Sequence, residues 1–125
     1  MINYFLVGIG GFLGSILRYS ASGFVQHIFG KSYFPYGTLF VNIFGCVLIG
    51  FFSGLAENRQ LFNPETRILV FVGFLGGFTT FSTFGYEVFN FARDGQITSS
   101  LINIALHVVF GVGAVGFGYS LSKLV

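Results

Sequence analysis

Charged residues are scarce in this chain, and the few that occur are spread along its length. They make up 8% of the 125 residues, whereas a typical soluble domain has about a quarter. A soluble domain could not cover its surface with so few charges. The net charge of +2 is too small and too dispersed for the basic surface that nucleic-acid binding requires, so we expect no nucleic-acid partner.

Groups suited to covalent or metal chemistry are also few. Cys46 is the only cysteine, so the chain can form neither an internal disulfide nor a zinc site built from several thiolates. The four acidic residues and two histidines are scattered along the sequence. Because no hydrolytic or metal-dependent catalytic constellation can be assembled from them, we expect that the protein is not an enzyme.

Apolar residues dominate instead, at 54% of the chain. They form four runs, each long enough for a transmembrane helix, which needs about 20 residues. The runs are continuous, which favours helices over the alternating strands of a membrane β-barrel. The sequence predicts an all-α membrane protein, a single domain over residues 1–125 in the lipid bilayer, with transmembrane spans at about 2–28, 36–56, 64–92 and 97–121.

Three short polar connections separate the runs, and the last, Arg93-Asp94-Gly95-Gln96, is a tight turn. In the second, Asn63-Pro64-Glu65 predicts a helix start from a capping asparagine, a first-turn proline and an acidic residue. Four spans place both termini on one membrane face. Lysine and arginine normally accumulate on the cytoplasmic side, but here they divide almost equally between the faces: Arg59, Arg67 and Lys123 against Lys31, Arg93 and, within the first span, Arg18. The chain therefore has little preference for either orientation.

The third run contains an unusual segment, Gly76-Gly77-Phe78-Thr79-Thr80-Phe81-Ser82-Thr83-Phe84. Adjacent glycines and a series of hydroxyl residues weaken a helix, because glycine has a high backbone entropy and serine and threonine compete for backbone hydrogen bonds. We predict a break in the helix here. Broken helices at mid-membrane depth occur where the freed backbone groups are buried in protein or line a polar cavity or ion site. The alternative is a glycine-packed kink without function.

Uncharged polar groups and aromatic rings accompany this segment. Phe78, Phe81 and Phe84 would share one face if the chain were helical there, and the edge of an aromatic ring carries partial positive charge. Asn42, in the second run, is an amide that is costly in lipid unless it faces a partner or a pore. These groups suit a path for a small anion better than a reaction centre.

Two motifs resemble the Fluc family, also called CrcB, of small microbial fluoride channels. Gly37-Thr38-Leu39 with Val41-Asn42 is similar to the second-helix motif of the family, and the segment from Gly76 to Phe84 is similar to its third-helix break. The length and the four-span plan match along the whole chain. The resemblance implies a dual-topology, antiparallel homodimer in the inner (plasma) membrane. It also implies two pores, each lined by both subunits, through which fluoride leaves the cell passively and fluoride toxicity is relieved.

The resemblance also implies roles for individual residues. Those that would contact fluoride are Asn42, Phe81 and Phe84 as pore lining, Thr38 and Ser82 as supporting donors, and Arg18 in the vestibule. The backbone carbonyls of Gly76 and Thr79 would hold a structural sodium ion at the dimer interface.

The fourth run departs from the family pattern. The family often has a serine or threonine about one turn after the position of His107, but this chain has Gly111. A polar track along this span would then depend on Asn103, His107 or water. Histidine can change its charge near neutral pH. The alternative interpretation of His107 is a neutral ring hydrogen-bonded between helices.

Two other classes of protein are open on the residues alone. Proton-coupled small multidrug exporters also use four short helices and antiparallel dimers, but they resemble one another in having an acidic residue within the first helix. The first run of this chain has only Arg18, and Glu87 in the third run is the sole carboxylate within a span. A purely structural subunit would leave the expected helix break and Asn42 unexplained.

Overall fold

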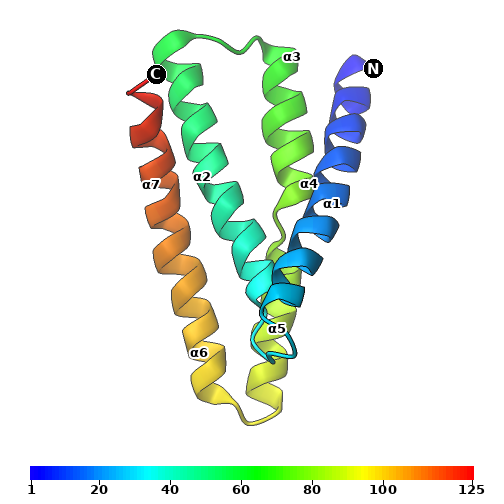
Figure 1. The fold of residues 1–125 in the computed structure, drawn as a ribbon. Helices are drawn as coiled ribbons and strands as arrows, with labels where there is room; N and C mark the ends of the chain where they lie inside the picture. Colours follow the sequence, from blue (N-terminus) through cyan, green and yellow to red (C-terminus); the bar gives the residue numbers. More distant parts are fainter.

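The computed structural model describes residues 1–125 as an arrangement of helices without strands (Figure 1). Four helical spans are long and apolar enough to cross a membrane: Ile2–Ile28, Tyr36–Arg59, Pro64–Arg93 and Ile97–Ser122. The prediction of an all-α chain with four membrane-spanning helices is therefore confirmed.

The first two spans are single helices, α1 (Ile2–Ile28) and α2 (Tyr36–Arg59), whereas the other two are each built from shorter pieces. The third span comprises α3 (Pro64–Arg67), the π-helical segment η1 (Ile68–Leu75), α4 (Gly76–Phe78) and α5 (Phe81–Arg93). The fourth comprises α6 (Ile97–Ala105), the π-helical segment η2 (Leu106–Phe110) and α7 (Gly111–Ser122). The sequence does not predict the π-helical turns, because a continuous apolar run does not distinguish i→i+4 from i→i+5 hydrogen bonding.

Both termini lie at the same end of the molecule as the connection between α2 and α3, and the other two connections lie at the opposite end (Figure 1). The Asn63 side chain caps α3 by accepting a hydrogen bond from the Thr66 N–H at 2.8 Å, and Pro64 follows in the first turn. Gly95, in the turn before α6, has a φ of 76°, a left-handed conformation that glycine adopts without strain. That turn reverses the chain and lets α6 pack against α5.

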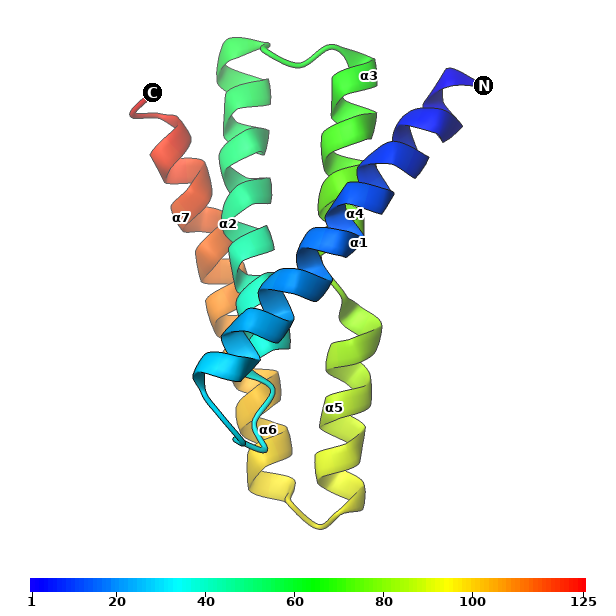
Figure 2. The ribbon, with the colours of Figure 1, turned by 45° about the vertical axis from the view of Figure 1, so that its right-hand side comes forward.

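The helices pack mainly as two pairs. α2 runs alongside α7, and α1 crosses the third span at η1 and α4 (Figure 2). Glycines permit the close approach within each pair. A Cβ atom at Gly50 of α2 would collide with the Val115 carbonyl oxygen of α7, and one at Gly118 with the Val47 carbonyl oxygen of α2. Small residues at helix contacts are the usual basis of packing in lipid, where no hydrophobic force drives helices together.

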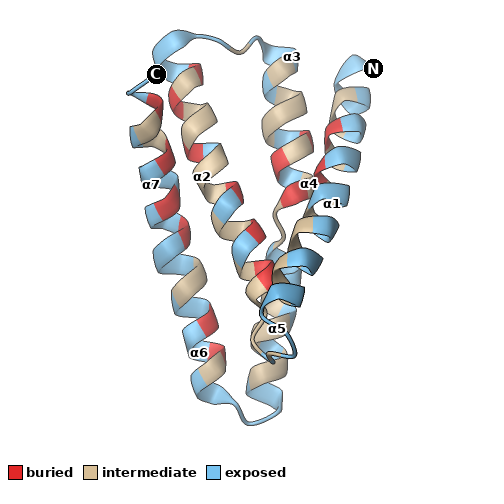
Figure 3. Cartoon of the chain, viewed as in Figure 1, coloured by how far each residue is buried: buried red, intermediate tan, exposed pale blue.

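Burial in this chain is confined to the helix faces that meet one another (Figure 3). Only 18 of the 125 residues are buried, while large apolar side chains such as Phe12, Phe24 and Val112 are exposed. A surface of this kind matches an apolar solvent, which accepts such side chains at no cost. The buried positions therefore report helix contacts rather than a thick hydrophobic core.

The helical path of the third span is interrupted between α4 and α5. Thr79 (φ −91°, ψ 160°) and Thr80 (φ −150°, ψ 112°) both have extended backbone. α5 then begins at Phe81, with the Thr80 hydroxyl accepting a hydrogen bond from the Thr83 N–H at 3.2 Å. The two extended residues lie midway along the span, so their backbone polar groups need partners other than a helix.

We predict that Gly118→Ala lowers the free energy of unfolding by about 1–3 kcal/mol, the usual cost of overpacking. The added methyl group would meet a backbone carbonyl of α2, which cannot move unless α2 and α7 separate. Gly116→Ala is the matched control, because nothing lies within 4 Å of a Cβ atom at that position. Thermal unfolding in detergent, followed by circular dichroism, compares the two, and an equal Tm for both variants would contradict the packing described.

Candidate functional site

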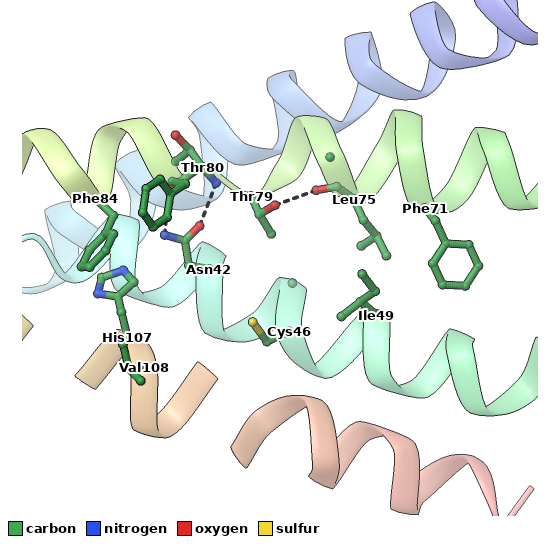
Figure 4. Close-up of a pocket in the computed structure, with 13 residues that line it drawn as sticks. Asn42, Cys46, Ile49, Phe71, Leu75, Thr79, Thr80, Phe84, His107 and Val108 are labelled. Atoms are coloured by element: carbon green, nitrogen blue, oxygen red, sulfur yellow. Dashed lines mark hydrogen bonds between the residues drawn. The ribbon is translucent and has the colours of Figure 1, made fainter. Parts of the chain in front are cut away.

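The Asn42 side chain holds the extended segment of the third span. Its Nδ2 donates to the Thr80 carbonyl oxygen at 3.0 Å, and its Oδ1 accepts from the Thr80 N–H at 2.8 Å (Figure 4). One amide of α2 therefore satisfies both backbone groups of a residue that lies outside any helix. An amide NH2 has two donor hydrogens, so one N–H of Asn42 remains beyond this pair of bonds.

A cavity of about 370 Å³ lies beside this pair of hydrogen bonds. α2, the third span and the fourth span all contribute to its wall, and Figure 4 shows the side chains. No Asp, Glu, Lys or Arg is among them. The lining residues are Asn42, Gly45, Cys46, Ile49, Phe71, Leu75, Gly76, Thr79, Thr80, Phe81, Phe84, His107 and Val108. We refer to this space as the first cavity.

Phe81 and Phe84 meet at one end of the first cavity. Their ring centroids lie 5.6 Å apart with an interplanar angle of 61°, so an edge of one ring faces the other. Phe84 also packs against the imidazole of His107, with centroids 4.2 Å apart. Phe81 is 82% exposed in the single chain. The structure thus brings together three of the predicted pore residues: Asn42, Phe81 and Phe84.

A second cavity, of about 590 Å³, lies on another side of the third span. It contains Arg18 and Thr38, which are therefore separate from the first cavity, and Thr80 is the one residue that lines both. The buried Thr38 hydroxyl donates a hydrogen bond to the Glu87 carboxyl group. Reasoning from the sequence did not assign Glu87 a role in the site, although its position as the only carboxylate within a span is a signal for one.

Ser82 is the predicted donor that the structure sets apart. It is exposed and lines neither cavity, and its Oγ lies 3.4 Å from the Thr80 hydroxyl. The Thr80 hydroxyl in turn donates to the Thr83 hydroxyl at 3.0 Å. Thr83 lines the second cavity, so the hydroxyl groups form a short chain that leads away from the extended segment.

Asn103 of the fourth span is buried, whereas His107 is half-buried and lines the first cavity. Asn103 is 0% exposed, and neither its amide oxygen nor its amide nitrogen has a hydrogen-bond partner. Its backbone carbonyl oxygen lies 3.0 Å from Nδ1 of His107. Gly111 faces α2, where an added Cβ atom would lie 3.7 Å from Sγ of Cys46. The position thus has room for a small side chain but supplies no polar group.

The carbonyls of Gly76 and Thr79 are the groups expected to bind a cation. The Thr79 carbonyl oxygen accepts no hydrogen bond from the backbone or from a side chain. In a continuous helix the Thr80 N–H would donate to the Gly76 carbonyl, but here it donates to Asn42. Both carbonyls thus lack the donor that a regular helix would supply, and both residues line the first cavity.

Comparison with known proteins gives consistent matches over nearly the whole chain. A protein-family model described as CrcB-like protein, Camphor Resistance (CrcB), matches residues 5–119. A protein of Methanosarcina acetivorans named fluoride-specific ion channel FluC 1 is 47% identical over 118 residues, covering 94% of this chain and 88% of the relative. Proteins named fluoride-specific ion channel FluC from Chlorobium phaeobacteroides and Maridesulfovibrio salexigens are 44% and 39% identical, covering 95% and 100% of this chain and 91% and 98% of the relatives.

We predict that Asn42→Leu destabilises the extended segment, because both polar groups of the Thr80 backbone lose their partner. Buried polar groups without partners cost about 1–3 kcal/mol each. Hydrogen exchange of the peptide that contains Thr79 and Thr80 should accelerate, as measured by mass spectrometry. Asn90→Leu is the control, because the amide oxygen of Asn90 has no hydrogen-bond partner to lose. Unchanged exchange in Asn42→Leu would show that the amide does not hold the segment.

Proposed function

The chain belongs to the CrcB family, and we propose from this premise that it is a passive, fluoride-selective ion channel that exports fluoride and so relieves fluoride toxicity. The observation that carries the proposal is the identity of 39–47% to proteins named fluoride-specific ion channels, over nearly their full length. We further propose that it acts in the inner (plasma) membrane as a channel rather than as an enzyme.

The chemistry of the first cavity supports an anion path. A channel must replace the hydration shell of the ion it conducts. Here the replacements are the ring edges of Phe81 and Phe84 and the remaining N–H of Asn42, all of which present partial positive charge without a fixed cation. A site of this kind can stabilise a small anion without binding it so tightly that it cannot leave.

The second cavity supports the role of an entrance. It contains Arg18, whose guanidinium group raises the local concentration of anions, and it shares the lining residue Thr80 with the first cavity. Thr38, whose hydroxyl donates to Glu87, is proposed as a supporting polar group on this route. Ser82, which lines neither cavity, is proposed as a supporting donor beside the Thr80 hydroxyl. Asn103 and His107 are the proposed polar track along the fourth span.

We propose that the functional unit is an antiparallel homodimer with two pores. The near-equal division of lysine and arginine between the two ends gives the chain little orientational bias. Phe81, at 82% exposure, is an anion-path residue with its ring outside the single chain. A second copy that covers this ring would complete the wall of the pore, and two-fold symmetry would then produce two identical pores.

A structural sodium ion at the dimer interface is part of the proposal. Carbonyl oxygens without donors cost several kcal/mol each in a dry site, and the Thr79 carbonyl, together with that of Gly76, fits the oxygen ligands that a sodium ion requires. The ion would satisfy the same carbonyls from both chains without a carboxylate. Its charge would also offset the repulsion between anions in neighbouring pores.

A proton-coupled multidrug exporter is not supported. The relatives are named fluoride-specific ion channels rather than exporters. The first span lacks a carboxylate, and the carboxyl group of Glu87 in the third span is hydrogen-bonded to Thr38.

The proposed function is tested by ion efflux from liposomes that contain the purified protein. We expect fluoride efflux well above that of protein-free liposomes, and chloride efflux at the level of those liposomes. Phe81→Ile and Phe84→Ile should each lower fluoride efflux by about fivefold, because they keep apolar bulk but remove a ring contribution of about 1 kcal/mol. Phe24→Ile, on the exposed face of α1, is the control and should leave the flux unchanged. Fluoride flux unaffected in both pore variants would remove the rings from the mechanism.

The antiparallel arrangement predicts that C-termini occur on both sides of the membrane. A cysteine in a C-terminal tag, introduced after Cys46→Ser, should react with an impermeant reagent to about half of its total in intact cells, because the two orientations insert equally. The remaining half should react only after the membrane is opened. Complete labelling, or none, from the outside would contradict dual topology.

The sodium site predicts a dependence on cation that is unrelated to ion coupling. Replacement of sodium by a large organic cation throughout purification and assay should abolish fluoride flux, and restored sodium should recover it. The same replacement in the outside buffer alone should have little effect, since a structural ion exchanges slowly when buried between subunits. Full activity in protein that has never met sodium would refute a structural role.

A further inference from the structure

The two ring nitrogens of His107 have different surroundings. Nδ1 lies 3.0 Å from the backbone carbonyl oxygen of Asn103, one turn earlier in the fourth span. A carbonyl oxygen only accepts hydrogen bonds, so Nδ1 carries the proton in this contact. The neutral ring is therefore held as the Nδ1–H tautomer, and its Nε2 atom bears a lone pair. This tautomer is set by the helix, because the acceptor of the Nδ1–H bond is a backbone carbonyl oxygen of the same span.

Nε2 is the nitrogen without a partner. It is out of contact with solvent and has no hydrogen-bond partner in the chain. The ring to which it belongs lines the first cavity and packs against Phe84 (Figure 4). An unpaired acceptor in such surroundings is costly. Because Nδ1–H is bonded to the Asn103 carbonyl and Nε2 carries a lone pair, the neutral ring has no hydrogen-bond donor left for an anion in the cavity. In the neutral state His107 therefore adds nothing to the attraction that the neighbouring ring edges offer an anion.

No other residue can supply a positive charge to the first cavity. Its lining contains no Lys, Arg, Asp or Glu, and the remaining ionisable side chain, Cys46, becomes an anion when it ionises. Of the charged groups nearby, Glu87 of α5 lines the second cavity and accepts a hydrogen bond from Thr38. Glu87 also lies close to the Asn103 side chain, one turn before His107. Arg18 of α1 lines the second cavity as well. Protonation of His107 at Nε2 would thus add the one positively charged side chain to the wall of the first cavity.

We propose that His107 is a proton-dependent anion-attracting residue, which offers fluoride no hydrogen-bond donor when neutral and attracts it through the positive charge of its imidazolium ring, with the added proton on Nε2, when protonated. This inference rests on the proposed fluoride channel. The proton comes from water, and Nδ1 keeps its bond to the Asn103 carbonyl in both states. Fluoride flux should therefore increase as pH falls, and bound fluoride should in turn favour the protonated ring, because linkage between the two binding events is reciprocal.

The first test is fluoride efflux from proteoliposomes at equal inside and outside pH between about 4.5 and 8, the range in which histidines titrate in proteins. Leak of the undissociated acid, measured with protein-free liposomes, is subtracted at each pH. Wild-type flux should rise by about tenfold across the titration of one histidine. His107→Gln, which is polar but cannot become a cation, should conduct with a pH dependence of less than about twofold. His27→Gln, at the end of α1 and outside the first cavity, should behave as the wild type.

The outcomes distinguish a failure of the proposed role of His107 from a failure of the proposed fluoride-channel function. Wild-type fluoride flux that is the same at every pH, or that keeps its pH dependence in His107→Gln, overturns the role of His107 but leaves the channel intact. An absence of fluoride flux at all pH values overturns both. If His107→Gln fails to assemble, 15N NMR of the histidines in the wild-type protein tests the proposal instead. The neutral His107 ring should show the Nδ1–H tautomer, and fluoride, but not chloride, should raise the pH at which it protonates. The Nε2–H tautomer, or no response to fluoride, overturns the proposal.

Discussion

The pair of hydrogen bonds between the Asn42 amide and the Thr80 backbone is the interaction on which the site depends. Lipid offers no water to backbone groups, so an extended residue inside a membrane span must find its partners within the protein. Asn42 supplies both partners to Thr80 and so allows the third span to be interrupted there, while the carbonyls of Gly76 and Thr79 still lack the donors that a regular helix would supply. Phe81 and Phe84 then leave the restarted helix beside that same amide, which is why the rings and the donor converge on one cavity.

Partial charges rather than formal ones characterise the resulting cavity. Fixed cations would bind a small anion strongly in a low dielectric and slow its release, and the nearest arginine, Arg18, lines the other cavity. Glycines keep this arrangement compact, because they let α2 meet α7, and α1 meet η1, at the level of the backbone. Few side chains are buried as a result, and the exposed apolar surface is left to lipid and to the proposed second subunit.

Much of the fold could be predicted from the sequence, because apolar runs and capping residues act locally. The spans follow from run length, and the start of α3 follows from Asn63 and Pro64. The partners of polar residues could not be predicted, since they depend on the register between distant spans. Asn42 was expected to face a pore, and the structure adds that most of its bonding capacity goes to Thr80. The pairing of Thr38 with Glu87, and the separation of Ser82 from both cavities, likewise require the three-dimensional arrangement.

Thr80 is the only residue shared by the walls of the two cavities. The third span therefore lies between the two cavities, and Thr80 borders both of them. An ion that passes from one compartment to the other would shed its water in two stages, first among the polar side chains around Arg18 and then among aromatic rings. In the proposed channel, the size of the Thr80 side chain would set how far these two stages overlap. It would thereby set the balance between fast passage and discrimination among ions.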